Sequence, residues 1–366
     1  MSQTIGFIGL GLIGGSIAKT IRRVHPDYSI IACDANRENL TQALADGTLN
    51  QAHDTVSQGF ARCDFIFLCA PVHINIHYLH ILKNIISPGC ILTDVGSVKN
   101  QIHKAVESLE LTRQFIGGHP MTGSEKSGYA SASDRLLENA YYIITPTANN
   151  DRSDIDRLVA LVKSLAALPV VLDAGHHDYI TAAISHLPHI IAYTLVNLVK
   201  ESDDSDERMR MLAAGGFKDI TRIASSSPVM WQQICGENSE NILLVLDNYI
   251  RSLRQIETAI RENDETYLLD YFDRAKAYRN AIPKSGAKGS IRPLYDIYVD
   301  IIDESGAIAT IATILATNGI SIKNIGIIHN REFEEGVLKI EFYEDAASDK
   351  AVQLLRRFHY VVHEPK

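Results

Sequence analysis

The sequence has little cysteine, and no two cysteines stand in the C-x-x-C spacing of redox and zinc motifs. The five that it has are an odd number, and most lie in or beside apolar stretches. They are Cys33, Cys63, Cys69, Cys90 and Cys235. We therefore expect buried free thiols in a reducing compartment rather than a disulfide framework.

Long hydrophobic runs and excess positive charge are also absent. No uninterrupted apolar run approaches the roughly 18 residues of a membrane span, and the apolar start lacks the basic segment of a signal peptide. We expect no membrane association and a cytoplasmic location. The formal net charge of -9 argues against a nucleic-acid partner, and it requires a local cluster of cations wherever an anionic substrate binds.

What is present is a chain of 366 residues, 46% of them hydrophobic, which is enough for two or three domains. Over residues 1–148, strand-like and helix-like patterns alternate. Strands are expected at Thr4–Ile8, Ser29–Asp34, Asp64–Ala70, Gly89–Asp94, Gln114–Gly118 and Tyr141–Thr145, and helices at Leu12–Val24, Arg37–Asp46, His73–Ile86 and Val98–Ser108. Near-continuous apolar strands are typical of a parallel sheet covered on both faces. The pattern predicts the α/β class and a doubly wound Rossmann domain.

Residues 149–282 favour an all-helical middle domain. After one short strand at Val170–Leu172, helical patterns dominate from His176 to Ala281. Ile190–Val199 is apolar enough for a buried helix, and Ile242–Ile260 has amphipathic spacing. The Pro-, Gly- and Ser-containing stretch 283–293 is the clearest linker in the chain.

Residues 294–366 follow the order strand, helix, strand, strand, helix, strand. The expected ranges are Tyr295–Ile302, Ala307–Asn318, Ile320–Ile328, Gly336–Tyr343, Ala346–Arg357 and Tyr360–His363. A turn at Asp303–Gly306 and a helix stop at Gly319 separate the first three elements. This βαββαβ order predicts a ferredoxin-like domain.

A glycine-rich turn follows the first strand and opens the first helix. In Gly9–Gly14, the first glycine permits a tight turn, Gly11 lets the backbone approach a pyrophosphate, and Gly14 allows close packing of helix and strand. Asp34 lies 20 residues after Gly14, at the end of the second strand, where a partner for the ribose 2′-OH belongs. A glycine-rich turn without a ligand is the structural alternative.

Asp34 favours NAD, because its carboxylate repels the 2′-phosphate of NADP, although Arg37 nearby weakens that argument. We therefore predict NAD as the cofactor. The predicted cofactor-binding residues are Gly9, Gly11, Leu12, Ile13, Gly14, Asp34, Pro71, Val72 and Ser97.

Three later motifs carry further chemistry. Asp94–Lys99 (DVGSVK) ends a strand, and Gly117–Glu125 (GGHPMTGSE) spans the next strand and its loop. Ser185–His189 (SHLPH) is followed by Gly215–Arg222 (GGFKDITR) and by Trp231. In this order, over residues 4–282, the motifs resemble those of the prephenate dehydrogenase family.

The resemblance implies NAD-dependent oxidation of prephenate to 4-hydroxyphenylpyruvate with loss of CO2, and a homodimer formed by the helical domain. It implies that His119 is catalytic and that Ser97 assists it beside the nicotinamide. The residues that it implies for substrate binding are Ser124, Glu125, Ser185, His189, Lys218, Arg222 and Trp231.

The residue types suit that reaction. A neutral imidazole takes up a hydroxyl proton near neutral pH, and Arg222 can hold a carboxylate with two parallel hydrogen bonds. Lys218 and Arg222 are four residues apart and would share a helix face, which supplies the local positive charge. Ring aromatisation drives the decarboxylation, so we expect no metal.

Each candidate also has a structural interpretation. His119 could satisfy backbone groups at a strand end, Ser97 could cap a helix, and Lys218 could be a solvated surface residue. His186 and His189 could pack against a helix, and Trp231 could belong to the core. His73, His77 and His80 share a helix face at a spacing that could bind Zn²⁺, but no obvious further ligand completes that set.

The C-terminal residues 294–366 resemble an ACT domain. That resemblance implies amino-acid binding at a dimer interface. L-tyrosine, the end product of the pathway to which prephenate oxidation belongs, would be the natural inhibitor. The alternative is a ferredoxin-like module that only dimerises.

Three rival functions remain open. An arogenate dehydrogenase would act on the amino-acid analogue of prephenate. A β-hydroxyacid dehydrogenase shares the pattern of Ile5–Gly14 but would lack the GGHP and SHLPH motifs. A non-catalytic amino-acid sensor would use the ACT domain alone, and His119 and Arg222 argue against it.

Overall fold

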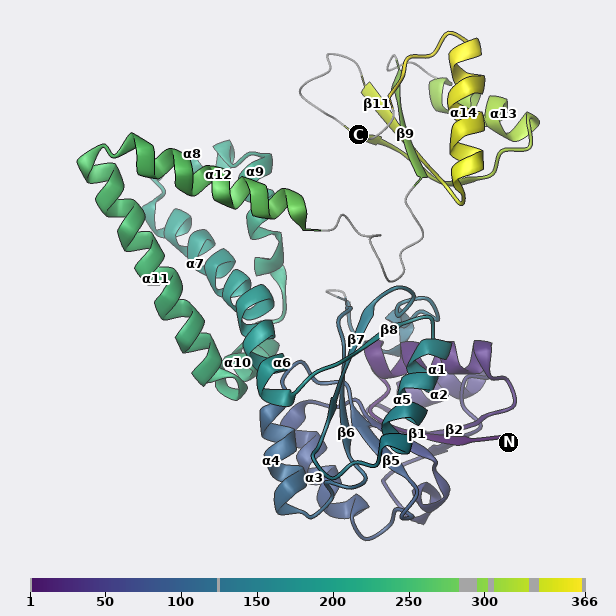
Figure 1. Cartoon of the computed structure of the whole chain (residues 1–366). Coiled ribbons are helices and arrows are strands. Elements are labelled where there is room, and N and C mark those ends of the chain that lie inside the picture. Colours follow the sequence, from purple (N-terminus) through teal and green to yellow (C-terminus); the bar gives the residue numbers. More distant parts are fainter. Residues whose placement is uncertain (1, 124–125, 283–294, 302–305, 329–335, 364–366) are drawn as a thin grey trace. The chain divides into compact units, whose positions relative to one another are not determined.

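The structure is a computed structural model that describes residues 2–123, 126–282, 295–301, 306–328 and 336–363. The chain forms two compact units, Met1–Leu268 and Leu269–Lys366, and each is treated by itself (Figure 1). The predicted linker 283–293 and most of the predicted turn at 303–306 lie outside the described residues.

The first unit opens with a five-stranded parallel sheet in the order β3-β2-β1-β4-β5. Its strands are β1 (Thr4–Ile8), β2 (Ser29–Cys33), β3 (Gln51–His53), β4 (Phe65–Leu68) and β5 (Ile91–Asp94). Within β4, Phe65 and Phe67 enter one apolar cluster, and Ile66 and Leu68 enter the other. Both faces of the sheet are therefore buried, which explains the continuous apolar runs.

Helices cover both faces of this sheet. Side chains of α1 (Leu12–Val24), α2 (Arg37–Ala45) and α5 (Arg152–Ser164) join the first cluster, and those of α3 (Val72–Leu82) and α4 (Asn100–Ser108) join the second. The predicted Rossmann arrangement is confirmed. The sequence reading missed β3, which is short and only partly buried, and α5.

A three-stranded sheet in the order β6-β7-β8 follows the parallel sheet. β6 (Ile116–Pro120) joins β5 through a parallel bridge between Leu92 and Phe115. β7 (Tyr141–Pro146) then runs antiparallel to β6, and β8 (Leu168–Val171) runs parallel to β7. An alternating apolar pattern alone does not distinguish this reversal from another parallel crossover.

A helical segment follows β8. It consists of α6 (Ala174–Thr181), α7 (Leu187–Ser202), α8 (Arg208–Leu212), α9 (Gly215–Thr221), α10 (Pro228–Glu237), α11 (Ser239–Glu262) and α12 (Glu265–Ala281). A π-helical turn, Ala182–His186, joins α6 and α7 into one continuous helix. Pro188 has no N–H for the carbonyl of Ile184, so an uninterrupted α-helical ladder cannot form there.

The continuous helix Ala174–Ser202 is, among the described residues, the one helix whose length and composition would allow it to cross a membrane, a test that core helices of soluble proteins also pass. The prediction that Ile190–Val199 is buried is wrong for the single chain, because Ala192 is the only buried residue of α7. Most of its other residues are only partly buried, and the exposed ones lie mainly in its C-terminal half.

The second unit contains the predicted βαββαβ domain. Its elements are β9 (Tyr295–Ile301), α13 (Ala307–Thr317), β10 (Ile322–Ile328), β11 (Gly336–Phe342), α14 (Asp345–Arg357) and β12 (Val362–His363). The sheet is antiparallel in the order β10-β11-β9-β12. Gly319, at φ 72°, ends α13, and Ile320 N–H donates to the Leu315 carbonyl, as in a Schellman stop.

Candidate active site

The glycine-rich loop between β1 and α1 has room for a ligand at one position only. A Cβ on Gly9, at φ +91°, would lie 2.9 Å from the backbone of Cys69, and one on Gly14 would lie 2.5 Å from the Gly9 carbonyl. A Cβ on Gly11 would meet nothing within 4 Å. The first turn of α1 has neither a side-chain cap nor an acidic residue. The loop therefore fits the pyrophosphate of a dinucleotide.

Asp34 is fixed at the rim of this loop. Its carboxylate accepts hydrogen bonds from Leu10 N–H and, at 2.6 Å, from Asn36 N–H. Arg37, which could attract a 2′-phosphate, forms an ion pair with Asp54 at 3.2 Å. Both of these side chains are largely exposed, so the pair is weak. A carboxylate at the end of β2 fits the ribose hydroxyl of NAD.

A buried ion pair holds the backbone beside His119. Lys99 Nζ bonds to Asp94 and donates to the Gly118 carbonyl at 2.6 Å, and Gly118 N–H donates to Asp94 Oδ1 at 3.1 Å. The side chains of Lys99 and Asp94 are fully buried. Burial lowers the pKa of Lys99, and the adjacent Asp94 carboxylate opposes that shift. Both hydrogen-bonding groups of the residue before His119 are thus fixed.

The His119 ring lies near the end of β6 and contacts α6. Its Nδ1 is 2.8 Å from Nε2 of His177, whose Nδ1 is 2.8 Å from Asp178 Oδ1. Burial holds the pKa of His119 well below its usual value, and His177 and the Lys99 ammonium lower that pKa further. His119 is therefore neutral at pH 7 and can accept a proton.

Asp178 joins three elements at this point. Its carboxylate accepts the backbone N–H groups of Lys99 at 2.7 Å and Asn100 at 2.8 Å, and so caps α4. Its carbonyl accepts from Asn238 Nδ2 at 2.8 Å. The cap of α4 therefore comes from Asp178, and Ser97 lies half-buried in the loop before Lys99, which is the N-cap residue.

A cluster of aromatic rings adjoins this hydrogen-bond network. Asn238 Nδ2 lies 3.2 Å from His186 Nδ1, and the His186 ring meets Trp231 edge to face, with centroids 5.9 Å apart. The ring of His189 also contacts Trp231 and stacks on it, with centroids 3.8 Å apart. Contacts thus run without a break from His119 to His189.

The aromatic cluster has unused hydrogen-bonding groups. Among the described residues, Nδ1 of His189 and Nε1 of Trp231 are buried without a hydrogen-bond partner. Burial lowers the pKa of His189, the Ile223 carbonyl opposes that shift, and the charge of Arg222 adds to it. Because its charge lowers the pKa of His189, Arg222 is electrostatically coupled to this cluster. The two buried polar atoms call for a ligand or a water.

The other predicted site residues are placed as follows. Lys218 on α9 and Arg222, the C-cap residue of α9, are exposed, and Ser185 lies half-buried in the π-helical turn. Pro71 and Val72 begin α3 at the same sheet edge as the glycine loop. Ser124 and Glu125 lie outside the described residues. His73, His77 and His80 are exposed along α3, and no group of three or more ligand-type residues in the described ranges could hold a metal ion.

The sequence reading missed His177, Asp178 and Asn238. The available signal was the pair His177-Asp178 one turn into the helix after β8, because an acid beside a histidine is the usual means of orienting an imidazole. Asn238 carries no such signal, since its role depends on the turn between α10 and α11.

Two family models match the chain. Residues 17–171 match the model described as the nucleotide-binding domain of prephenate dehydrogenase, and residues 173–274 match its dimerization domain. The chain is 40% identical to the prephenate dehydrogenase of Bacillus subtilis, with 97% of this chain and 96% of the relative covered.

Solved structures agree with this match. Prephenate dehydrogenase of Aquifex aeolicus, in complex with hydroxyphenyl propionate and NAD⁺, has a TM-score of 0.73 and 31% identity, covering 77% of this chain and 99% of that chain. Arogenate dehydrogenase of Synechocystis has a TM-score of 0.69 and 29% identity, covering 76% and 99%. The chain therefore belongs to the prephenate dehydrogenase family of NAD-dependent oxidoreductases.

Proposed function

We propose that the chain catalyses the oxidative decarboxylation of prephenate to 4-hydroxyphenylpyruvate in tyrosine biosynthesis. The observation that carries this proposal is His119, a neutral imidazole held by its Nδ1 at the sheet edge that also presents the dinucleotide loop. Kinship over nearly the whole length with the Bacillus subtilis prephenate dehydrogenase supports it.

His119 is the base of the proposed reaction. Bound NAD would supply the acceptor for the hydride of ring C4, and the loop Gly9–Gly14 with Asp34 would hold it. The C4 hydroxyl proton goes to Nε2 of His119, because Nδ1 is already engaged by His177. The bond between the ring and its carboxylate then breaks, CO2 leaves, and the ring becomes aromatic. His119 can return its proton to the same oxygen, so no net proton is required.

We assign substrate binding to the aromatic cluster and the cations beside it. The guanidinium of Arg222 suits a bidentate carboxylate contact, and Lys218 adds positive charge. His189 and Trp231 offer the unused polar atoms described above. Ser97 is assigned to the nicotinamide end of the site, and Ser124, Glu125 and Ser185 are assigned to substrate binding.

The decisive experiment is an assay of NADH formation by the purified protein with prephenate and NAD, repeated with arogenate and with NADP. We expect the prephenate and NAD pair to be used best. His119→Asn should abolish turnover and leave NAD binding measurable by fluorescence titration. Near-normal turnover of this variant would remove the catalytic assignment.

Arogenate is the second candidate substrate, because a solved arogenate dehydrogenase shares the fold over its whole length. The two substrates differ in a keto group and an ammonium group. The side-by-side assay decides between them, and a higher kcat/KM for arogenate would reverse our order of preference.

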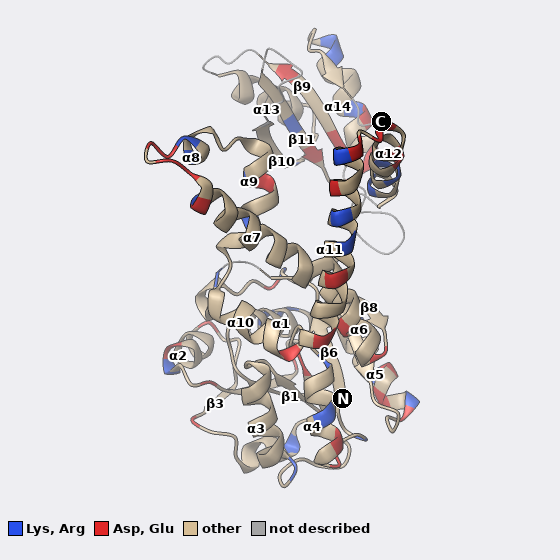
Figure 2. Cartoon of the chain, turned by 90° about the vertical axis from the view of Figure 1, so that its left-hand side faces the viewer, with Lys and Arg blue, Asp and Glu red and all other residues tan. Residues whose placement is uncertain are grey.

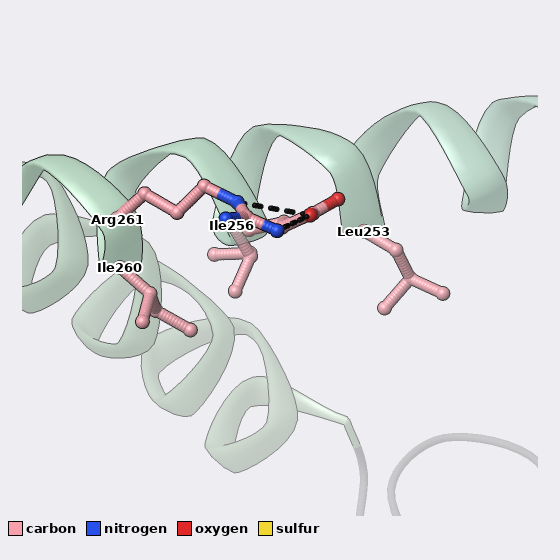
Figure 3. A pocket seen from close by; sticks show the side chains of 5 residues that line it. Leu253, Ile256, Ile260 and Arg261 are labelled. Atoms are coloured by element: carbon pink, nitrogen blue, oxygen red, sulfur yellow. Dashed lines mark hydrogen bonds and ion pairs between the residues drawn. The ribbon is translucent and has the colours of Figure 1, made fainter.

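We propose that the chain acts as a homodimer through its helical segment. Apolar side chains of α7 and α11 are exposed in the single chain, among them Leu198 at 57%, Leu253 at 49% and Ile260 at 59%. Apart from its last turn, α7 carries no charged residue (Figure 2). Leu253, Ile256 and Ile260 line a shallow apolar hollow on α11, beside the Arg261–Glu257 ion pair (Figure 3). A second copy would bury this surface.

We further propose that L-tyrosine binds the βαββαβ domain and lowers activity. The four-stranded sheet with two helices supports the ACT assignment, and an end product is a natural effector. Deletion of residues 284–366 should remove tyrosine inhibition and leave basal turnover. Inhibition that persists in the shortened chain would place the tyrosine site elsewhere.

We also propose a cytoplasmic location. The five free thiols suit a reducing compartment.

A further inference from the structure

A buried relay stands behind the proposed base. His177 is 1% exposed and Asp178 is fully buried, and neither belongs to the residues assigned above to substrate or cofactor. The rings of His119 and His177 lie 5.1 Å apart at 75°, edge to face, so one nitrogen of each ring faces the other. The geometry is that of a histidine oriented by a second histidine, which an aspartate orients in turn.

The hydrogen positions in this relay follow from Asp178. Its Oδ1 also accepts the Lys99 N–H, and both oxygens cap α4, so the carboxylate serves as acceptor throughout. Nδ1 of His177 must therefore donate to it at 2.8 Å. Nε2 of a neutral His177 then carries no hydrogen and accepts the hydrogen of His119 Nδ1.

This leaves one arrangement for the proposed base. With its hydrogen on Nδ1, neutral His119 has its lone pair on Nε2, which is the atom that must take the substrate proton. The opposite arrangement would put the hydrogen on Nε2 and block that transfer. It would require His177 to donate from both nitrogens, as a second buried cation near the Lys99 ammonium.

We infer that His177, held by Asp178, is a positioning residue that fixes the tautomer and orientation of His119 for proton transfer. The inference rests on the proposed function of His119 as base. His177 is itself immobilised, because its N–H donates to the Asp173 carbonyl at 2.8 Å and its carbonyl accepts from Thr181 Oγ1 at 3.1 Å.

A matched pair of substitutions tests the acceptor. Gln and Met have nearly the same length, but only Gln offers an oxygen to the Nδ1 hydrogen of His119. We expect His177→Met to lower kcat about 100-fold with KM for NAD unchanged, and His177→Gln to recover at least about 10-fold of that loss. Equal losses in both variants would reduce His177 to a packing residue, and wild-type kcat in His177→Met would overturn the inference.

Asp178→Asn provides a second test that preserves the shape of the relay. When the amide oxygen accepts from Asn100 N–H, the NH2 group stands where Oδ1 stood and loses the bond from Lys99 N–H. It then donates to His177 Nδ1 and reverses the hydrogen positions. We expect kcat to fall at least about 10-fold with KM for NAD unchanged, since a similar change in a hydrolase triad costs about 10⁴. Wild-type kcat in this variant would contradict the relay. His25→Met is the matched control, because His25 also uses a ring nitrogen, 2.8 Å from Ser164 Oγ, but lies outside the site.

A spectroscopic measurement separates this inference from the proposed reaction. Protein labelled with ¹⁵N-histidine should give a protonated Nδ1 and an unprotonated Nε2 for His119, with the signals assigned by their loss in His119→Asn. Asp178→Asn should invert that pattern. A protonated Nε2 in the wild type would sink the relay whether or not the chain oxidises prephenate, whereas an inactive chain with the expected signals would sink only the proposed function.

Discussion

The carboxyl edge of the sheet buries charged side chains, whereas the helical segment leaves apolar side chains exposed. At the sheet edge Asp94 and Lys99 are fully buried, and each has several hydrogen-bond partners. In the helical segment, apolar side chains such as Leu253 and Ile260 are about half exposed. The base is therefore fixed within one chain, while the helical segment requires another surface to complete it.

Breaking the buried pair should have the largest effect. Lys99→Met leaves the Asp94 carboxylate buried without its partner, and we expect a loss of about 3–5 kcal/mol in the free energy of unfolding, measured by urea titration. The control is Lys83→Met, which removes an exposed pair with Glu110 and should cost about 1 kcal/mol or less. Equal losses would mean that the sheet edge is no more tightly organised than the surface.

Arg222→Lys should separate substrate binding from chemistry. Lysine keeps the charge but loses the paired donors, so KM for prephenate should rise about 10- to 100-fold while KM for NAD stays constant. The control is Arg210→Lys on α8, an exposed arginine paired with Glu207. A change in kcat alone would indicate that Arg222 acts on the transition state rather than on binding.

The apolar helical surface offers a test of assembly. Changing Leu253 and Ile260 together to Lys should shift sedimentation from dimer to monomer at micromolar protein, because two charges would be buried in the interface. Leu44→Lys on α2, an apolar residue that is 43% exposed, should leave the dimer intact. An unchanged dimer would place the interface on another face.

Gly11, which precedes α1, and Gly14, in its first turn, should respond differently to substitution. Gly14→Ala should destabilise the protein by about 1–3 kcal/mol, because its Cβ would lie 2.5 Å from the Gly9 carbonyl. Gly11→Ala should keep the melting temperature and raise KM for NAD about 10-fold, since its Cβ meets only the space assigned to the pyrophosphate. The opposite pattern would contradict the cofactor assignment.

The pH dependence should be the smallest effect near neutrality. Since His119 acts as a neutral base and its pKa is lowered, kcat/KM should stay flat from pH 8 downward and fall with a midpoint below the ordinary value of about 6.5. A midpoint above that value would contradict the burial argument. The fold weakens over the same range, because His186, with its pKa lowered to about 4, binds a proton more readily when unfolded. Melting curves at each pH separate the two effects.

Much of the fold could be predicted from periodicity. The ranges of β1 and α1 were predicted to the residue, and the order of the C-terminal elements was predicted in full. Local pattern fails where the outcome depends on distant parts of the chain. The antiparallel direction of β7 and the uncovered face of α7 are results of packing, which an apolar stretch of sequence does not encode.

The candidate site divides in the same way. Gly9–Gly14 and Asp34 could be found because spacing along the chain sets their geometry. The pair His177-Asp178 is visible in the sequence, but its contact with His119 is not, because His177 lies 58 positions beyond His119 and β7 and β8 come between them. Roles for Lys218 and Arg222 rest on resemblance, since both side chains are exposed and spacing along the chain does not set their geometry.

The π-helical turn makes the length of one helix a functional quantity. A π turn holds an extra residue, and each residue advances an α-helix by about 100°. His177 and Asp178 precede the turn, and His189 follows it in the same continuous helix. Removing one residue of this turn, such as Ala183, would change the rotational phase between the relay and the stacked pair. One surplus residue thus sets the angle between the directions in which His177 and His189 leave the same helix.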